Sequence, residues 1–250
     1  MIAIINDELK IYRGEDFVVS KYIKIHQPSL GEICDYGEQA YYSMIYYLTA
    51  TPQSMKWQLW NIGIDYTEIS PFFLFCQVLY QTYTHEETSI IFDGLELSKF
   101  VLKQRIDDGS YFLQQEINGE TVIIDEFTYN VIVDHLRQVH GIHKDEKMPA
   151  NESTKMILIE DDREEYLRNK NKEYRSQLKN LISTMVNCEG FKYNHSQVWD
   201  MKINAFMDSV KRVAKIKNAD LLLQSGYSGF GINLKEIDKK QIDWQGGLDQ

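Results

Sequence analysis

Helix-start signals recur at short intervals in the first third of this chain. Each pairs a capping residue either with a glutamate three positions later or with a proline directly after it, and both patterns favour the first turn of a helix. The signals are Ser29 with Glu32, Thr51 with Pro52, Ser70 with Pro71, and Thr84 with Glu87. They predict four short helices between about residues 30 and 93, the first of roughly five turns.

β-forming residues replace this pattern between about residues 96 and 125. The stretches "FVLKQRI", "SYFLQQEI" and "ETVIID" are separated by the turn sequences "DDG" and "NG". Asp-Gly and Asn-Gly between apolar stretches are strong hairpin signals, so we expect a small antiparallel meander here. The N-terminal "ELKIYRGEDFVVSKYIKIH" is expected to add one or two strands, with a turn at Gly14.

A polar stretch at residues 144–154 divides the chain into two parts. It lacks periodicity and contains a proline, as linkers often do. We therefore predict a mainly α fold with a small β meander, an α+β protein of two helical parts. The first is an acidic domain over residues 1–143 that ends with a helix at 126–140, and the second is a helical domain over residues 155–250 with a loose C-terminal tail.

Charge is distributed unevenly between these parts. The chain carries 27 Lys and Arg against 37 Asp and Glu, and residues 1–150 hold 11 of the former and 22 of the latter. Nucleic-acid binding depends on basic residues that neutralise phosphates, so the acidic first part argues against it. The strongest basic feature is the helix around Lys211, Arg212 and Lys215. We expect protein partners and no nucleic acid.

Candidate catalytic and metal-binding groups are sparse. His135 and His140 are five positions apart, and Gly141 interrupts the helix before His143, so we interpret these as surface histidines and not as a metal site. The glycine-rich "SGYSGFG" lacks the Lys-Ser/Thr of a phosphate-binding loop and follows a helix rather than a strand. We expect no enzymatic activity, no metal and no cofactor.

Apolar runs in the chain are short, and the N-terminus lacks the pattern of a signal peptide. We therefore expect a protein of the host cytoplasm that has no membrane partner. Large apolar side chains are the candidate contacts for a protein partner, with core packing as the alternative role for most of them. The candidates are Trp57, Trp60, Phe72, Phe73, Trp199, Phe206 and Met207.

Three stretches of the chain resemble proteins encoded by tailed phages and prophages of Gram-positive hosts. They are "YGEQAYYSMIYYLTATPQSMKWQLWNIGIDYTEIS" at residues 36–70, "LISTMVNCEGFKYNHSQVWDMKINAFMDSVKRV" at 181–213 and "LLQSGYSG" at 222–229. Genes of that family lie among tail genes. The resemblance implies a tail assembly chaperone that binds apolar helical segments of the tape-measure protein during tail morphogenesis, and that self-associates. A virion structural subunit of the baseplate, neck or tail-completion type is the alternative.

Overall fold

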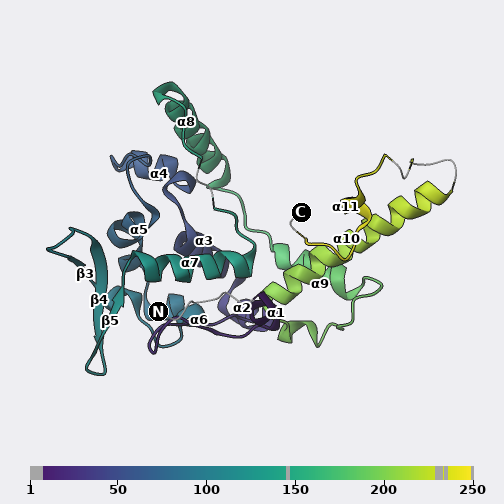
Figure 1. Ribbon diagram of the computed structural model, residues 1–250, viewed down its shortest axis with the longest axis horizontal. Coiled ribbons are helices and arrows are strands. Elements are labelled where there is room, and N and C mark those ends of the chain that lie inside the picture. Colours follow the sequence, from purple (N-terminus) through teal and green to yellow (C-terminus); the bar gives the residue numbers. More distant parts are fainter. Residues whose placement is uncertain (1–7, 145–146, 229–232, 234–235, 249–250) are drawn as a thin grey trace.

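The computed structural model describes residues 8–144, 147–228, 233 and 236–248 (Figure 1). Helices make up 57% of it, beside two small antiparallel sheets, so the predicted mainly α, α+β class is confirmed. The α-helices of the described residues are α1 (Glu8–Arg13), α2 (Leu30–Tyr36), α3 (Glu38–Thr49), α4 (Lys56–Asn61), α5 (Pro71–Leu74), α6 (His85–Phe92), α7 (Glu126–His140), α8 (Glu152–Asn169), α9 (Gln177–Val186), α10 (Ile203–Tyr227) and α11 (Lys239–Ile242).

Three of the four predicted capping signals start α-helices, whereas Thr51 starts a short 3₁₀ turn at Pro52–Ser54 and α4 begins after it. Ser29 and Glu32 form a capping box at the start of α2, and Thr84 and Glu87 form another at α6. The first helix is nevertheless two helices, because Gly37 adopts a φ of 103° between α2 and α3. Glycine reaches positive φ without the strain that a Cβ brings, so the chain changes direction at this point.

The predicted meander is confirmed. Its strands are β3 (Val101–Gln104), β4 (Tyr111–Ile117) and β5 (Glu120–Ile124), paired antiparallel in the order β3-β4-β5. Residue pairs Gln104–Tyr111 and Ile117–Glu120 flank the two turns. Leu113 and Ile124 are buried on the inner face of the sheet.

The N-terminal prediction was partly wrong. Residues 8–13 form helix α1, because Glu, Leu, Lys and Arg all favour a helix over a strand. Gly14 ends this helix, and the hairpin of β1 (Phe17–Val18) and β2 (Lys24–Ile25) turns later, where Ile23 O accepts the N–H groups of Val19 and Ser20.

Helix α7 lies at the centre of the fold, in contact with α3, α5, α10 and β5. Two of the histidines expected at the surface point into this region. His135 is buried and stacks on Phe17, with ring centroids 4.3 Å apart. The hydroxyl of Tyr41 lies 2.7 Å from His140 Nε2, while His140 Nδ1 lies 2.7 Å from Leu136 O. The surface interpretation was wrong because these rings lie on the side of α7 that faces the core.

Helix α8 packs on the first part of the chain, although it follows the predicted linker. It begins at Glu152 and contacts α4. Asp162 accepts the main-chain N–H of Trp57 at 2.8 Å, and Lys155 pairs with Asp65 at 2.7 Å. The segment 170–176 then leads to α9 without helix or strand.

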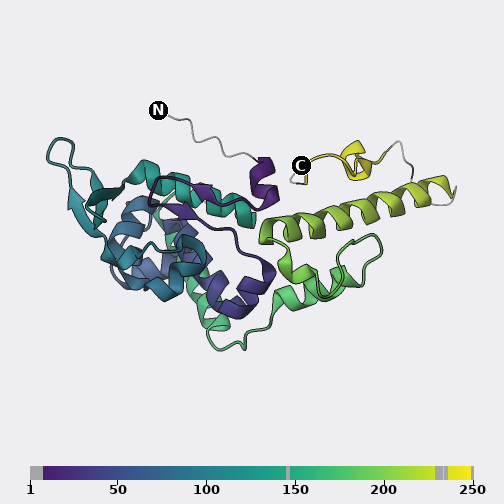
Figure 2. The same cartoon turned by 90° about the horizontal axis from the view of Figure 1, so that it is seen from below.

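The C-terminal segment returns to α10, beside which α11 lies in Figure 2. Arg212 donates hydrogen bonds to Trp244 O at 2.6 Å and Gly246 O at 2.9 Å, and Lys215 donates to Gly247 O at 2.6 Å. A loose tail was predicted here, but these two cations bind residues 244–247 to the helix. Within the described residues, no helix is both long and apolar enough to span a bilayer.

Candidate functional site

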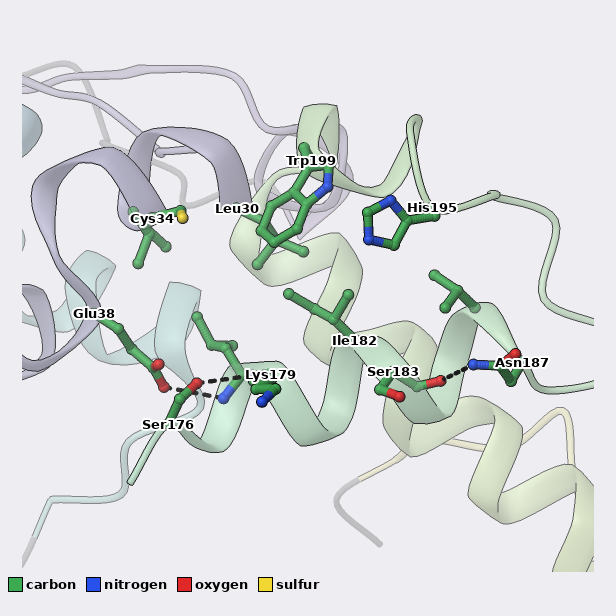
Figure 3. Close-up of a pocket in the computed structure, with 13 residues that line it drawn as sticks. Leu30, Cys34, Glu38, Ser176, Lys179, Ile182, Ser183, Asn187, His195 and Trp199 are labelled. Carbon is green, nitrogen blue, oxygen red and sulfur yellow. Dashed lines mark hydrogen bonds between the residues drawn. The ribbon is translucent and has the colours of Figure 1, made fainter. Parts of the chain in front are cut away.

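An apolar groove of about 430 Å³ lies between α2 and α9 (Figure 3). Its walls are aliphatic side chains from both helices, and an indole closes one side. The apolar residues that line it are Leu30, Ile33, Leu178, Ile182, Val186 and Trp199. The other residues that line it are Cys34, Glu38, Ser176, Lys179, Ser183, Asn187 and His195. A hollow of this composition suits apolar side chains of a ligand or partner.

Helix α9 owes its orientation to an amphipathic pattern. Leu178, Ile182 and Met185 are buried, and their spacing of four and then three places them on one side of the helix. The helix begins at a capping residue, because Ser176 Oγ accepts the N–H of Lys179 at 2.9 Å. The apolar side of α9 therefore faces α2.

One end of the groove is held by Glu38 of α3. Its carboxylate accepts the N–H groups of Gln177 and Leu178, each at 3.0 Å, at the first turn of α9. A negative charge is favourable at this end of a helix. Partial burial alone would raise the pKa of Glu38, but hydrogen bonds from Leu178, Ser176, Tyr174 and Gln177 outweigh it and lower that pKa.

The other end is held by main-chain pairing between residues 28–30 and 201–203. Leu30 N donates to Met201 O at 2.9 Å, and Ile203 N donates to Pro28 O at 3.0 Å. These bonds join two segments far apart in the sequence. They fix the position of Trp199 over the groove.

Two glycines permit this close approach. A Cβ on Gly31 would lie 3.2 Å from Trp199 O, closer than most carbon–oxygen contacts. Gly14 has a φ of 77°, and a Cβ there would lie 2.3 Å from Lys202 Cγ. The absence of a side chain at both positions therefore allows segment 198–202 to lie this close to α1 and α2.

Glu32 contributes side-chain contacts to the same junction. Lys202 Nζ lies 3.6 Å from Glu32 Oε2, and His26 Nε2 lies 3.0 Å from Glu32 Oε1. Partial burial raises the pKa of Glu32, but hydrogen bonds from Ser29 and the charge of Lys202 outweigh burial and bring it to about 2. Glu32 therefore stays ionised where α2 meets the start of α10.

The predicted partner-binding residues are dispersed over the structure. Trp199 lines the groove, and Met207 lines a second hollow of about 760 Å³ between α1, α7 and α10. Phe72 and Phe73 line a third, of about 340 Å³, beside β4. Phe206 is fully buried and packs in the core.

Trp57 and Trp60 lie on α4, outside these three hollows. Trp57 is half-buried beneath α8, with Arg163 over its ring at 5.2 Å. Trp60 is 38% exposed. Of these two predicted partner residues, Trp57 therefore belongs to the contact between α4 and α8.

Sequence reasoning missed the aliphatic walls of the groove. Leu178 and Ile182 are separated by one helical turn in "QLKNLISTMV", so helical spacing was the available signal. That spacing shows that α9 has an apolar side but not that an open groove lies along it. Within the described ranges, no three His, Cys, Asp or Glu side chains gather where they could hold a metal ion.

Residues 169–246 match the family model of the YomV second domain, a phage-derived family related to the Bacillus phage SPbeta. The match covers less than a third of the chain, and it includes α9, Trp199 and α10. No curated protein and no solved structure matches the chain. The second part of the chain is therefore similar to a phage-associated domain.

The start of this match coincides with a change in structure and charge. Helix α8 ends at Asn169. Residues 1–168 hold 14 Lys and Arg against 28 Asp and Glu, a net charge of −14, whereas residues 169–250 hold 13 against 9, a net charge of +4. The groove lies between an acidic part of the chain and a basic part.

Proposed function

We propose that this chain is a non-enzymatic phage tail assembly protein that binds apolar helical segments of another tail protein. The α2–α9 groove is its binding site. The tape-measure protein is the expected partner, since the three stretches quoted above resemble proteins encoded among tail genes. The binding is transient, so the protein acts as an assembly chaperone in the host cytoplasm.

The groove is the observation that carries this proposal. Aliphatic side chains line both walls, and hydrogen bonds hold its two ends, one through the Glu38 carboxylate and the other through main-chain groups. Amphipathic helices bind such grooves through apolar residues spaced one turn apart. Lys179, a charged group at its edge, is available to set the orientation of a bound helix.

The comparison with known families supports the phage context of the proposal. The matched residues include the α9 wall of the groove and Trp199. The acidic first part supports the chaperone role, because net charge keeps a protein with an exposed apolar groove soluble.

The deciding experiment is quantitative mass spectrometry of purified phage particles and of infected-cell lysate. A transient chaperone is abundant in the lysate and absent from the particles. Stoichiometric presence in particles would overturn the chaperone proposal and favour a baseplate, neck or tail-completion subunit. Its copy number would then indicate its place in the virion.

A matched pair of variants tests the groove itself. Ser183 is exposed on α9 and lines the groove, whereas the adjacent Thr184 is exposed and does not line it. Ser183→Trp should fill the groove and weaken binding to tape-measure segments by at least about tenfold, while Thr184→Trp leaves it unchanged. Equal binding by both variants would exclude the groove as the site.

A further inference from the structure

Helix α8 has an outer side with exposed apolar residues. Figure 1 shows it extending away from the rest of the first part. Its inner side is fixed on α4 through the buried Ile159 and Lys155. Away from these two buried residues, Met156, Ile157 and Leu167 are 41%, 60% and 53% exposed. Exposed apolar side chains that gather on one surface can mark a protein–protein interaction site.

Acidic residues flank these apolar positions. Asp161 and Glu164 follow Ile157 at intervals of four and seven, so all three lie on one side of the helix. Glu160 and Glu164 follow Met156 at intervals of four and eight, next to the same side. The outer side of α8 therefore carries exposed apolar positions with acidic side chains between and beside them.

The groove has the complementary character. Its interior is apolar, and Lys179 lines its edge on α9. Arg175, which is exposed, directly precedes Ser176 at the same end. On the opposite wall, Glu38 is neutralised in part by the N–H groups of Gln177 and Leu178. The available positive charge therefore lies at the start of α9, on Lys179 and Arg175.

We propose that the outer side of α8 binds the α2–α9 groove of a second copy of this chain. Ile157 and Leu167 enter the groove, and Asp161 and Glu164 lie against Lys179 and Arg175. Each copy presents both surfaces, so the contact is head-to-tail and extends to chains or rings. The opposite net charges of residues 1–168 and 169–250 favour this orientation over a symmetric one.

Self-association would compete with the proposed function, because both use the α2–α9 groove as the binding site. In this arrangement α8 covers the groove until a tail-protein helix displaces it. This last step rests on the proposed function. The self-association itself does not, and it is measured with the purified full chain and no tail protein.

Two variants that each lose one surface provide the test. Ile157→Arg with Leu167→Arg removes the apolar side of α8 at exposed positions, and Ser183→Trp fills the groove. Sedimentation velocity should show concentration-dependent association of the wild-type chain that weakens at high salt. Each variant alone should raise the dissociation constant at least about tenfold. Thr184→Trp and Leu221→Arg, both outside the two surfaces, should associate like wild type.

An equimolar mixture of the two variants gives the decisive result. One variant keeps an intact groove and the other an intact α8, so the mixture should form dimers and nothing larger. Lys179→Glu replaces Ser183→Trp as the groove variant if circular dichroism shows that the latter is unfolded. A wild-type chain that stays monomeric at about 0.5 mM overturns the proposal. A mixture of the two variants that stays monomeric also overturns the proposal. The same holds if each variant alone associates as strongly as the wild-type chain.

Discussion

Asp162 of α8 accepts the main-chain N–H of Trp57 at 2.8 Å, so a carboxylate from one helix caps the first turn of another. Arg163, the next residue, lies over the Trp57 ring at 5.2 Å. These two contacts place α8 on α4 and give the predicted partner residue Trp57 a structural role. They also bring α8, which follows the predicted linker, onto the first part of the chain.

Removal of this cap should detach α8 before the rest of the protein unfolds. Asp162→Ala leaves an N–H of α4 without its carboxylate and should lower the free energy of unfolding by about 1 kcal/mol. Amide hydrogen exchange should accelerate in α4 and α8. The neighbouring Asp161 is exposed, so Asp161→Ala is the matched control and should change stability by less than about 0.5 kcal/mol.

Two glycines with similar backbone angles should differ in their tolerance of alanine. Gly14 and Gly63 have φ values of 77° and 80°, but a Cβ would contact Lys202 only at Gly14. Gly63→Ala should cost about 1 kcal/mol through backbone strain alone. Gly14→Ala should cost about 1–3 kcal/mol more, because the side chain of Lys202 must move. Equal costs in urea unfolding would show that the close approach at Gly14 is unimportant.

Acid should destabilise the protein through His135. Burial lowers the pKa of this ring to about 4 in the folded chain, whereas an unfolded histidine titrates near 6.5. The unfolded chain therefore binds more protons between these values, and stability falls as the pH falls through this window. The loss attributable to His135 at about pH 5.5 is about 1 kcal/mol relative to pH 7.5.

His140 contributes in the same direction, because burial also lowers its pKa to about 4. His135→Phe keeps an aromatic ring against Phe17 and removes one titrating group. Urea unfolding of this variant should show a smaller loss of stability between pH 7.5 and 5.5 than wild type. An unchanged loss would mean that His135 is not held neutral in the folded chain.

Glu38 should control the attachment of α9. Glu38→Gln removes the charge that accepts the N–H groups of Gln177 and Leu178, and should weaken this end of the groove by about 1 kcal/mol. Hydrogen exchange should accelerate in α9 and not in α7. Gln39→Ala, at the exposed neighbouring position, is the control and should leave both helices unchanged.

Elements governed by neighbouring residues were predictable from the sequence. The capping boxes at Ser29 and Thr84 act over three positions, and the turns of the meander lie within "DDG" and "NG". Local chemistry determines such features, so their prediction needed no knowledge of the fold. The split at Gly37 was missed because apolar spacing continues across it and hides the change of direction.

The groove could not be predicted in this way. It exists because Leu30 pairs with Met201 and Glu38 caps α9, and both contacts join residues far apart in the chain. The burial of His135 likewise depends on Phe17 of the N-terminal hairpin. Trp199 was selected for its size and does line the groove, but the same reasoning selected Phe206, which is in the core.

Arg212 and Lys215 hold the C-terminal segment by its carbonyl oxygens and not by its side chains. Every amino acid, proline included, supplies that oxygen. The attachment therefore uses no side chain of residues 244, 246 and 247, whereas it depends on the two cations of α10. Evolutionary constraint on this contact should therefore fall on Arg212 and Lys215 of the helix rather than on the side chains of the segment that they hold.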